Sequence, residues 1–468
     1  MCYQDPAKPT AILPTIETYA ARVLDFGALV FVLTSSDGVD PVLRCLFDRK
    51  LPFYCVQEPP VASDGRGRTS GEPPFPHIRV YPAAYTAPEH YAAEILQYGP
   101  RFSPAWDDPA AFELKGDVTE LCTKQRLILR RCFHDCSQLH LKKLPGGRSR
   151  AAVFRAHATI KTGTPTSPIF PFFVKLGPRS DVTMEWGNYG SSVTHRIPFY
   201  LAPRLDWGRC EVGASLGALV GDFVDYSESL SECATGARAS SAIGSLFERT
   251  IREWRSRGEE AAGPLYAALR LWFKLDRMRM PQHRFKLAQS MGLKTKYPLD
   301  LPRKLLGSRP PDERWMQGTI HGDLHAENIQ VRGADAILID FRATREKGLM
   351  LADPAALETS LVFRAPGGPS FDSTAWSSEV GRLYEQPNLR AVPGVPDPRE
   401  PYAWLGSCVR QIRLYALELE RRPGQYASVL AYRMLHAACK TDDPGSRGQE
   451  WRRATAACLA EQLFTMIW

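Results

Sequence analysis

Polar residues capable of chemistry follow a short apolar run and recur at the end of a second one. The first group contains His321, Asp323 and Asn328, within residues 319–331, and the second apolar run ends at Asp340. Each run is typical of a β-strand, so the polar residues would lie at neighbouring strand ends. We therefore expect Asp323, Asn328 and Asp340 to converge on one site.

Two carboxylates and one amide are suited to phosphoryl transfer. In that reaction the protein mainly orients the acceptor and holds Mg²⁺ against the phosphates. Asp323 can accept the proton of an acceptor hydroxyl, while Asn328 and Asp340 supply the hard oxygen ligands that Mg²⁺ prefers. The sequence therefore predicts Asp323 as the catalytic residue and Asn328 and Asp340 as metal ligands. The alternative is a polar loop that lies between two strands by chance.

The spacing of these residues resembles that of a known superfamily. The pattern His-Gly-Asp-Leu-His-x-x-Asn, followed by Ile-Asp-Phe, is similar to the aminoglycoside phosphotransferase and choline kinase group, relatives of protein kinases. The interval from Asp323 to Asn328 matches that family (328 − 323 = 5). Protein kinases usually carry His-Arg-Asp and Asp-Phe-Gly, whereas this chain has Gly322 and Arg342 at those places. This difference favours the small-molecule branch.

The resemblance implies a nucleotide-binding half upstream. Lys175, at the end of an apolar run, is similar to the family's phosphate-pairing lysine, and Glu185 is its expected ion-pair partner. Gly146, Gly147 and Ser149 stand where a loop would cover the triphosphate, and glycine lets backbone N–H groups approach phosphate oxygens. The structural alternatives are an edge lysine, a solvated glutamate and a simple hairpin turn.

Two further residues are assigned supporting roles in the catalytic loop, His321 and Asp353. Asp353 precedes a proline, which is typical of a helix start, and we expect it to brace the loop. The segments around Glu185 and at residues 348–358 resemble the phosphotransferase-like domain of bacterial ternary-complex conflict systems. That narrower resemblance covers residues 130–468.

The hydrophobic pattern divides the chain into three parts. In residues 1–110 strands alternate with helices, which predicts a small α/β module with a parallel sheet, of unknown role. Residues 111–240 hold five short strand-like runs, which predict an antiparallel sheet, and residues 241–468 are mainly helical. With the resemblance, the expected fold class is α+β: a bilobal protein-kinase-like fold, with an antiparallel-sheet N-lobe and a helical C-lobe, preceded by the small α/β domain. The five runs are Gln138–Leu144, Ala151–Ile160, Phe170–Leu176, Phe199–Leu205 and Ala214–Val220.

Composition narrows the function class. The chain has 468 residues, 44% of them hydrophobic, which excludes a wholly disordered protein. A net charge of +8 suits anionic ligands but is small for a dedicated nucleic-acid binder. Eleven scattered cysteines indicate reduced thiols rather than disulfides, although Cys132 and Cys136 could belong to a metal site. With no signal peptide or membrane span evident, we expect a cytoplasmic protein.

The sequence therefore predicts a Mg²⁺-dependent transferase that moves the γ-phosphate of ATP or GTP to an unidentified small molecule or protein. The C-terminal helices lack the dense acidic cluster expected for a polycationic antibiotic, so an aminoglycoside is not the expected acceptor. A nucleotide-binding pseudokinase that signals in a bacterial defence-type system is the alternative, with residues 1–110 as a possible site for a protein partner. A nucleic-acid scaffold using the basic patch Lys142–Arg150 is a third, less economical reading.

Overall fold

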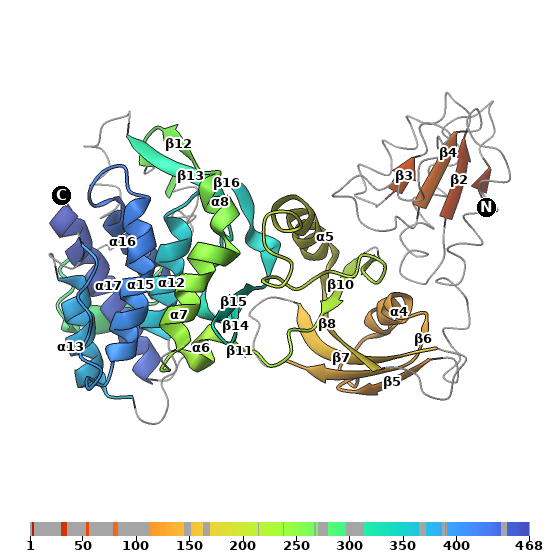
Figure 1. Ribbon diagram of the computed structural model, residues 1–468, viewed down its shortest axis with the longest axis horizontal. Coiled ribbons are helices and arrows are strands. Elements are labelled where there is room, and N and C mark those ends of the chain that lie inside the picture. Colours follow the sequence, from red (N-terminus) through yellow and green to blue (C-terminus); the bar gives the residue numbers. More distant parts are fainter. Residues whose placement is uncertain are drawn as a thin grey trace. The chain divides into compact units, whose positions relative to one another are not determined.

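The computed structural model divides into two compact units, Met1–Ser191 with Pro203–Val224, and Ser192–Ala202 with Asp225–Trp468. Figure 1 shows the elements of each unit, coloured along the chain. The structure describes residues 2–3, 30–34, 53–55, 78–82, 112–144, 151–161, 169–213, 215–236, 238–265, 268–269, 279–295, 313–364, 371–385, 389, 391–440 and 447–467.

A small parallel sheet is formed by the first four strands. β2 (Val30–Thr34) pairs with β1 (Cys2–Tyr3) and β4 (Ile78–Pro82), and β4 pairs with β3 (Phe53–Cys55). Every one of these pairs is parallel, which confirms the small parallel sheet predicted near the N-terminus. The helices predicted beside these strands lie outside the described residues.

The main sheet of the first unit has six strands and is antiparallel except for its first pair. Along its strands buried residues alternate with more exposed ones, as in Phe154, Ala156 and Ala158. This period of two places one face of each strand in a core. In spatial order the strands are β5 (Glu113–Gly116), β6 (Cys136–Lys143), β7 (Ala152–Ile160), β8 (Ile169–Pro178), β10 (Leu216–Asp222) and β9 (Glu211–Val212).

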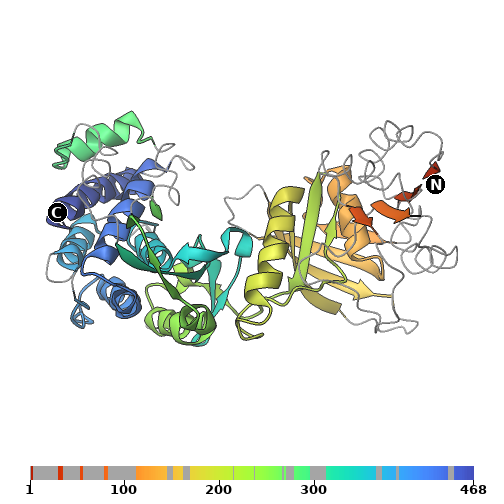
Figure 2. The same ribbon diagram turned by 90° about the horizontal axis from the view of Figure 1, so that it is seen from above.

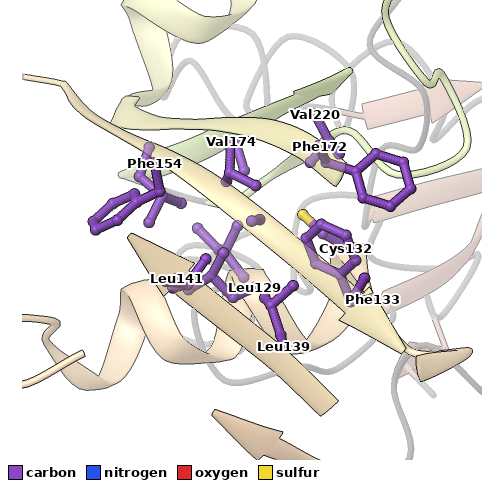
Figure 3. Close-up of a cluster of buried hydrophobic side chains, with 14 of the residues drawn as sticks. Leu129, Cys132, Phe133, Leu139, Leu141, Phe154, Phe172, Val174 and Val220 are labelled. Atoms are coloured by element: carbon purple, nitrogen blue, oxygen red, sulfur yellow. The ribbon is translucent and has the colours of Figure 1, made fainter. Parts of the chain in front are cut away.

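Helix α4 (Thr123–Cys132) covers the buried face of this sheet. Figure 3 shows Leu129 and Cys132 of the helix beside Leu139, Phe154 and other apolar side chains of the strands. Because these aliphatic and aromatic groups leave water together, they form one continuous core for the unit.

The cysteines in this core are structural. Cys132 and Cys136 are fully buried and neither forms a disulfide, and burial raises the pKa of Cys136 to about 12, helped by the charge of Asp135. A thiol with so high a pKa is a poor metal ligand at neutral pH. Within the described ranges no group of three or more His, Cys, Asp or Glu side chains is arranged to hold a metal.

One predicted strand of this region is wrong. Residues 199–204 form turns and irregular backbone, and only Leu205 makes an isolated bridge, to Gly221. The apolar run predicted a buried strand, but Phe199 is 84% exposed and does not contribute to the core. Pro198 and Pro203 also flank or interrupt the run, and proline cannot donate a ladder hydrogen bond. The short strands β5 and β9 carry too little pattern to be predicted from sequence.

The second unit contains two small antiparallel sheets. β13 (Arg314–Ile320) pairs with β12 (Glu259–Ala262) and with β16 (Arg345–Leu349). β14 (Ile329–Arg332) and β15 (Asp335–Leu338) form a tight hairpin, and β11 (Glu228–Ser229) adds to its edge. The polar loop predicted between two strands thus joins β13 to β14.

Helices make up most of the second unit, as predicted from residue 241 onward. α12 packs against α15 and α16, and α16 packs against α17, so these helices lie side by side in Figures 1 and 2. No helix in the described ranges is long and apolar enough to cross a bilayer. Among the described residues of this unit the α-helices are α6 (Leu230–Cys233), α7 (Arg238–Ser245), α8 (Arg252–Ser256), α10 (Gln282–Ser290), α12 (Ala352–Arg364), α13 (Ser373–Tyr384), α15 (Ala403–Glu418), α16 (Gln425–Cys439) and α17 (Arg447–Ile467).

Candidate active site

The loop after β13 is held by a carboxylate from another helix. The backbone N–H groups of His321 and Gly322 donate to the two carboxylate oxygens of Asp353, at 2.6 and 3.0 Å. Asp353 lies in the first turn of α12 and is buried. Burial raises the pKa of Asp353, although the charge of His321 and the two donated hydrogen bonds oppose that rise. The structure thus places Asp353 where the sequence expects a brace.

The ring of His321 ties the same loop to the end of β15. His321 is fully buried, and its Nε2 lies 2.9 Å from the carbonyl oxygen of Ile339. A carbonyl oxygen only accepts hydrogen bonds, so Nε2 must carry the proton and donate. Ile339 directly precedes Asp340, and the His321 ring also packs against Phe341. His321 therefore fixes the position of the strand end that carries Asp340.

Asn328 is oriented by a hydrogen bond within the loop. Its Nδ2 donates to the carbonyl oxygen of Asp323 at 3.0 Å. Because that carbonyl can only accept, the amide nitrogen faces it, and Oδ1 points to the other side of the amide group. The N–H of Ile339 also donates to the carbonyl oxygen of Asn328, at 3.0 Å. The hairpin therefore brings the backbone of Asn328 beside the chain that enters Asp340, and the amide oxygen is turned away from the Asp323 carbonyl.

Asp340 has an unusual backbone conformation. Its φ of 64° and ψ of 75° place it in the left-handed region, where the described residues include one other non-glycine residue, Tyr226. Aspartate tolerates this region better than most residues, but the conformation still costs energy. Such a conformation persists when surrounding contacts enforce it, and it is enriched at active sites.

Asp323 lies in a cationic environment. Its side chain is 47% exposed, and Nε2 of His325 is 3.8 Å from Oδ2. Partial burial acts to raise the pKa of Asp323, but the charges of His325, Lys440 and Arg433 outweigh it and lower that pKa. Asp323 is therefore ionised at neutral pH and able to accept a hydrogen bond.

Sequence reasoning missed two basic residues, one on α16 and one at its C-terminal cap, whose charges lower the pKa of Asp323. Arg433 and Lys440 lie more than a hundred positions beyond the loop (433 − 323 = 110). The one signal that could have found them is the presence of basic residues at helical spacing in an otherwise apolar stretch.

Glycine is required at position 322. Its φ is +80°, and a Cβ built there would lie 2.3 Å from the carbonyl oxygen of Ala343. We expect Gly322→Ala to lower the free energy of unfolding by about 1–3 kcal/mol, because both the backbone and the contact become strained. Urea titration measures this change. The matched control is Gly381→Ala, an exposed position on α13 with no atom within 4 Å, where alanine should stabilise the helix slightly. Equal stability of the two variants would contradict the expectation.

The first unit contains the predicted lysine and glutamate in direct contact. Nζ of Lys175 in β8 donates to Oε2 of Glu185 at 2.6 Å, and each side chain is 9% exposed. Glu185 lies on the buried face of α5 (Arg179–Asn188). It and Trp186 follow Val182, which is also buried, by three and four positions. The structure therefore brings Lys175 and Glu185 together.

The remaining predicted nucleotide-binding residues, Gly146, Gly147 and Ser149, lie outside the described residues.

A comparison with known protein families falls on the part of the chain that holds this loop. A family model described as ternary complex associated domain 9 matches residues 266–375. That range contains the loop and hairpin described above, and it confirms the predicted resemblance to a ternary-complex-associated domain. A search of curated proteins found no match.

Solved structures of kinases are also similar to this chain. Amicoumacin kinase hAmiN in complex with AMP-PNP, Ca²⁺ and Ami is 13% identical, over 69% of this chain and 88% of that one, with a TM-score of 0.36. Aminoglycoside phosphotransferase APH(4)-Ia with ADP and hygromycin B is 12% identical, over 72% and 97%, with a TM-score of 0.39. A glucosamine kinase is 12% identical, over 69% and 94%, with a TM-score of 0.35. Because these values are low, we take the function from the site's own residues.

Proposed function

We propose that the chain is a Mg²⁺-dependent phosphotransferase that moves the γ-phosphate of ATP or GTP to an acceptor hydroxyl. The observation that carries this proposal is the orientation of the Asn328 amide. Its nitrogen donates to the carbonyl oxygen of Asp323, which turns the amide oxygen away from that carbonyl, and the backbone carbonyl of Asn328 accepts from Ile339, the residue before Asp340. One amide oxygen and one carboxylate are a donor set that fits Mg²⁺, which usually keeps further ligands from water and phosphate.

Each residue of the chain has a distinct part in this proposal. Mg²⁺, when bound, neutralises charge on the phosphates. Asn328 and Asp340 would hold that ion, while Asp323 accepts the hydrogen bond of the acceptor hydroxyl and orients it. Lys175, held by Glu185, would contact the phosphates of the nucleotide, and the loop of Gly146, Gly147 and Ser149 would cover them. His321 and Asp353 act through the loop that they fix. A cytoplasmic location and a protein partner bound through residues 1–110 belong to the same proposal.

A second candidate function is a nucleotide-binding pseudokinase that acts as a signalling component of a bacterial defence-type system. The match to a ternary complex associated domain favours it, because that description concerns assembly rather than catalysis. Both candidates bind a nucleotide, and they differ only in whether phosphate is transferred.

Nucleotide binding should depend on Mg²⁺ and on Asp340. With Mg-ATP at 100 times its dissociation constant, the wild-type chain should gain about 2.7 kcal/mol of stability, measured as a shift in thermal unfolding. Asp340→Asn should lose most of this gain, because an amide is a weaker Mg²⁺ ligand than a carboxylate. The same measurement with Mg-GTP tests the choice of base.

A matched control for this test is Asp335→Asn. Asp335 begins β15, at the end of the strand opposite Asp340, and pairs with the half-exposed Arg249. This variant makes the same chemical change on the same hairpin and should keep the full Mg-ATP shift. An equal shift in both variants, or no shift in the wild type with either nucleotide, would contradict the proposed nucleotide site.

A further inference from the structure

Helix α12 holds the loop between β13 and β14 at two points. Asp353, in the first turn of the helix, accepts the backbone N–H groups of His321 and Gly322. Further along the helix, Oγ of Ser360 accepts the N–H of Ala326 at 2.9 Å. The two side chains are seven positions apart (360 − 353 = 7), close to two full turns. They therefore lie on one face of α12, about 10 Å apart, and hold both halves of the loop.

The contact from Ser360 falls where a tight turn begins. Ala326 is the first residue of a short 3₁₀ helix, Ala326–Asn328, which packs against α12. The backbone N–H of Asn328 donates to the carbonyl oxygen of His325 at 2.9 Å, and this hydrogen bond closes the turn. The turn thus ends at the residue that we propose as a Mg²⁺ ligand.

A single peptide group connects Ser360 to Asn328. The peptide between His325 and Ala326 supplies both groups in question: its N–H donates to Ser360, and its C=O accepts from the N–H of Asn328. A peptide group is planar and rigid, so its two ends cannot move independently. Wherever Ser360 holds the N–H, the position of the C=O, and with it the backbone of Asn328, is also limited.

The side chain of Asn328 is held from the other direction. Its Nδ2 donates to the carbonyl oxygen of Asp323 at 3.0 Å, and Asp323 directly follows the residues that Asp353 holds. The backbone of Asn328 therefore depends on Ser360, and the orientation of its amide depends on the part of the loop next to Asp353. Both anchors belong to α12.

Burial makes the hydroxyl of Ser360 difficult to replace. Ser360, Ala326 and Asn328 are 7%, 4% and 7% exposed. A buried N–H that loses its acceptor carries the full cost of its lost hydration, so the loop shifts to find another partner or remains strained. The adjacent Thr359 is equally buried, but its hydroxyl donates to the carbonyl oxygen of Ala355 in the same helix, at 2.6 Å. Two neighbouring hydroxyl groups of α12 thus serve different ends.

We propose that Ser360 is a positioning residue for the Mg²⁺ site. Acting through the peptide before Ala326, its hydroxyl holds Asn328 where the amide oxygen can bind the ion. This inference rests on the proposed phosphotransferase function. Asp353, by contrast, holds the part of the loop that leads to Asp323. The two contacts from α12 thereby divide the loop into a side that serves the metal and a side that serves the acceptor.

The Mg²⁺ requirement of nucleotide binding tests this role. For the full chain at a fixed, saturating concentration of ATP, thermal unfolding is followed at increasing Mg²⁺. Ser360→Ala should raise the Mg²⁺ concentration that gives half of the stability shift about tenfold, as is typical when a group that orients a metal ligand is removed. Excess Mg²⁺ should restore the full shift of the variant. Restoration by metal is a result that a general weakening of the fold would not produce.

Neighbouring substitutions separate this role from stability. Thr359→Val removes a hydroxyl that is as deeply buried on the same helix, and it should leave the half-saturating Mg²⁺ concentration unchanged. Ser360→Thr keeps the accepting hydroxyl and should keep the wild-type Mg²⁺ requirement. Ser360→Cys fills the same space with a weak acceptor, so it should show the same rise as alanine. The cysteine variant also tests the role if the alanine variant does not fold.

Two results would overturn the assignment of Ser360. One is a wild-type Mg²⁺ requirement in the alanine or cysteine variant, and the other is an equal rise in Thr359→Val. Both are distinct from failure of the proposed function. In that case the wild-type chain would show no Mg-ATP shift at any Mg²⁺ concentration, which would overturn the nucleotide site and this inference together.

Discussion

Asp323→Asn should reduce phosphoryl transfer by about 10²–10⁴-fold and leave Mg-ATP binding nearly intact. The carboxylate of Asp323 is half exposed and has its pKa lowered by nearby cations, so at neutral pH it is charged and can take a hydrogen bond from the acceptor. An asparagine keeps the shape of the side chain but cannot accept the proton. Its backbone carbonyl still orients Asn328, so the metal ligands should stay in place.

The rate is measured as slow Mg²⁺-dependent hydrolysis of ATP, with water as the acceptor. The matched control is Glu327→Gln. Glu327 is a half-exposed carboxylate in the same loop, and its Oε2 lies 3.8 Å from Nδ1 of His325. Its replacement makes the same change of charge near the same histidine and should alter the rate only slightly. Wild-type turnover in Asp323→Asn would exclude a catalytic role for this carboxylate.

The loop between β13 and β14 was predictable because the pattern that defines it is local in the sequence. The two apolar runs that follow the loop are separated by only two residues, so they pair as the hairpin of β14 and β15, which places Asn328 next to the chain entering Asp340. The contact of Lys175 with Glu185 was predictable for the same reason. The strand and helix that carry them are consecutive, so few arrangements were possible.

Contacts between distant segments were not predictable from one sequence. Periodicity shows that α16 is apolar on most faces, but not which helix or loop its few basic residues meet. The position of Arg433 and Lys440 relative to Asp323 depends on how α12 and α16 pack. The wrong strand at 199–205 has a related cause, because an apolar run of that length does not reveal whether its side chains are buried.

Helix α12 connects the loop between β13 and β14 to the helical core. Near its start Asp353 accepts from the loop backbone, and the hydroxyl of Ser360 accepts from the N–H of Ala326 at 2.9 Å. Between them Glu358 is fully buried and faces the neighbouring helices. The loop therefore depends on how firmly Glu358 anchors α12.

Glu358 is the centre of a buried polar network. It forms an ion pair with Arg413 of α15 at 2.6 Å, and both side chains are completely inaccessible to solvent. The hydroxyl groups of Tyr384 and Tyr426 donate to its two oxygens, at 2.9 and 2.8 Å. Burial raises the pKa of each tyrosine well above the usual range for tyrosine, and the charge of Glu358 raises it further. Both hydroxyl groups therefore stay protonated and donate. Nη1 of Arg413 also donates to the carbonyl oxygen of Leu383.

Glu358→Gln should lower the free energy of unfolding by about 3–5 kcal/mol, the largest stability loss that we expect from one substitution in this chain. Glutamine leaves Arg413 as a buried charge without a counter-ion. Both oxygens of Glu358 accept hydrogen bonds from Arg413 or a tyrosine. In glutamine one oxygen becomes an NH₂ group, which donates and so cannot accept from these neighbours. Urea titration followed by tryptophan fluorescence measures the loss.

The matched control is Glu253→Gln, which breaks the exposed i,i+4 pair with Arg257 on and just after α8. It makes the same change of charge, yet it should cost less than about 0.5 kcal/mol because solvent screens the pair. Adding Arg413→Met to Glu358→Gln should recover part of the loss, since the buried cation is then removed. A loss of unfolding free energy in Glu358→Gln as small as that in Glu253→Gln would show that the network does not anchor α12. The loop between β13 and β14 would then be held by Asp353 and Ser360 alone.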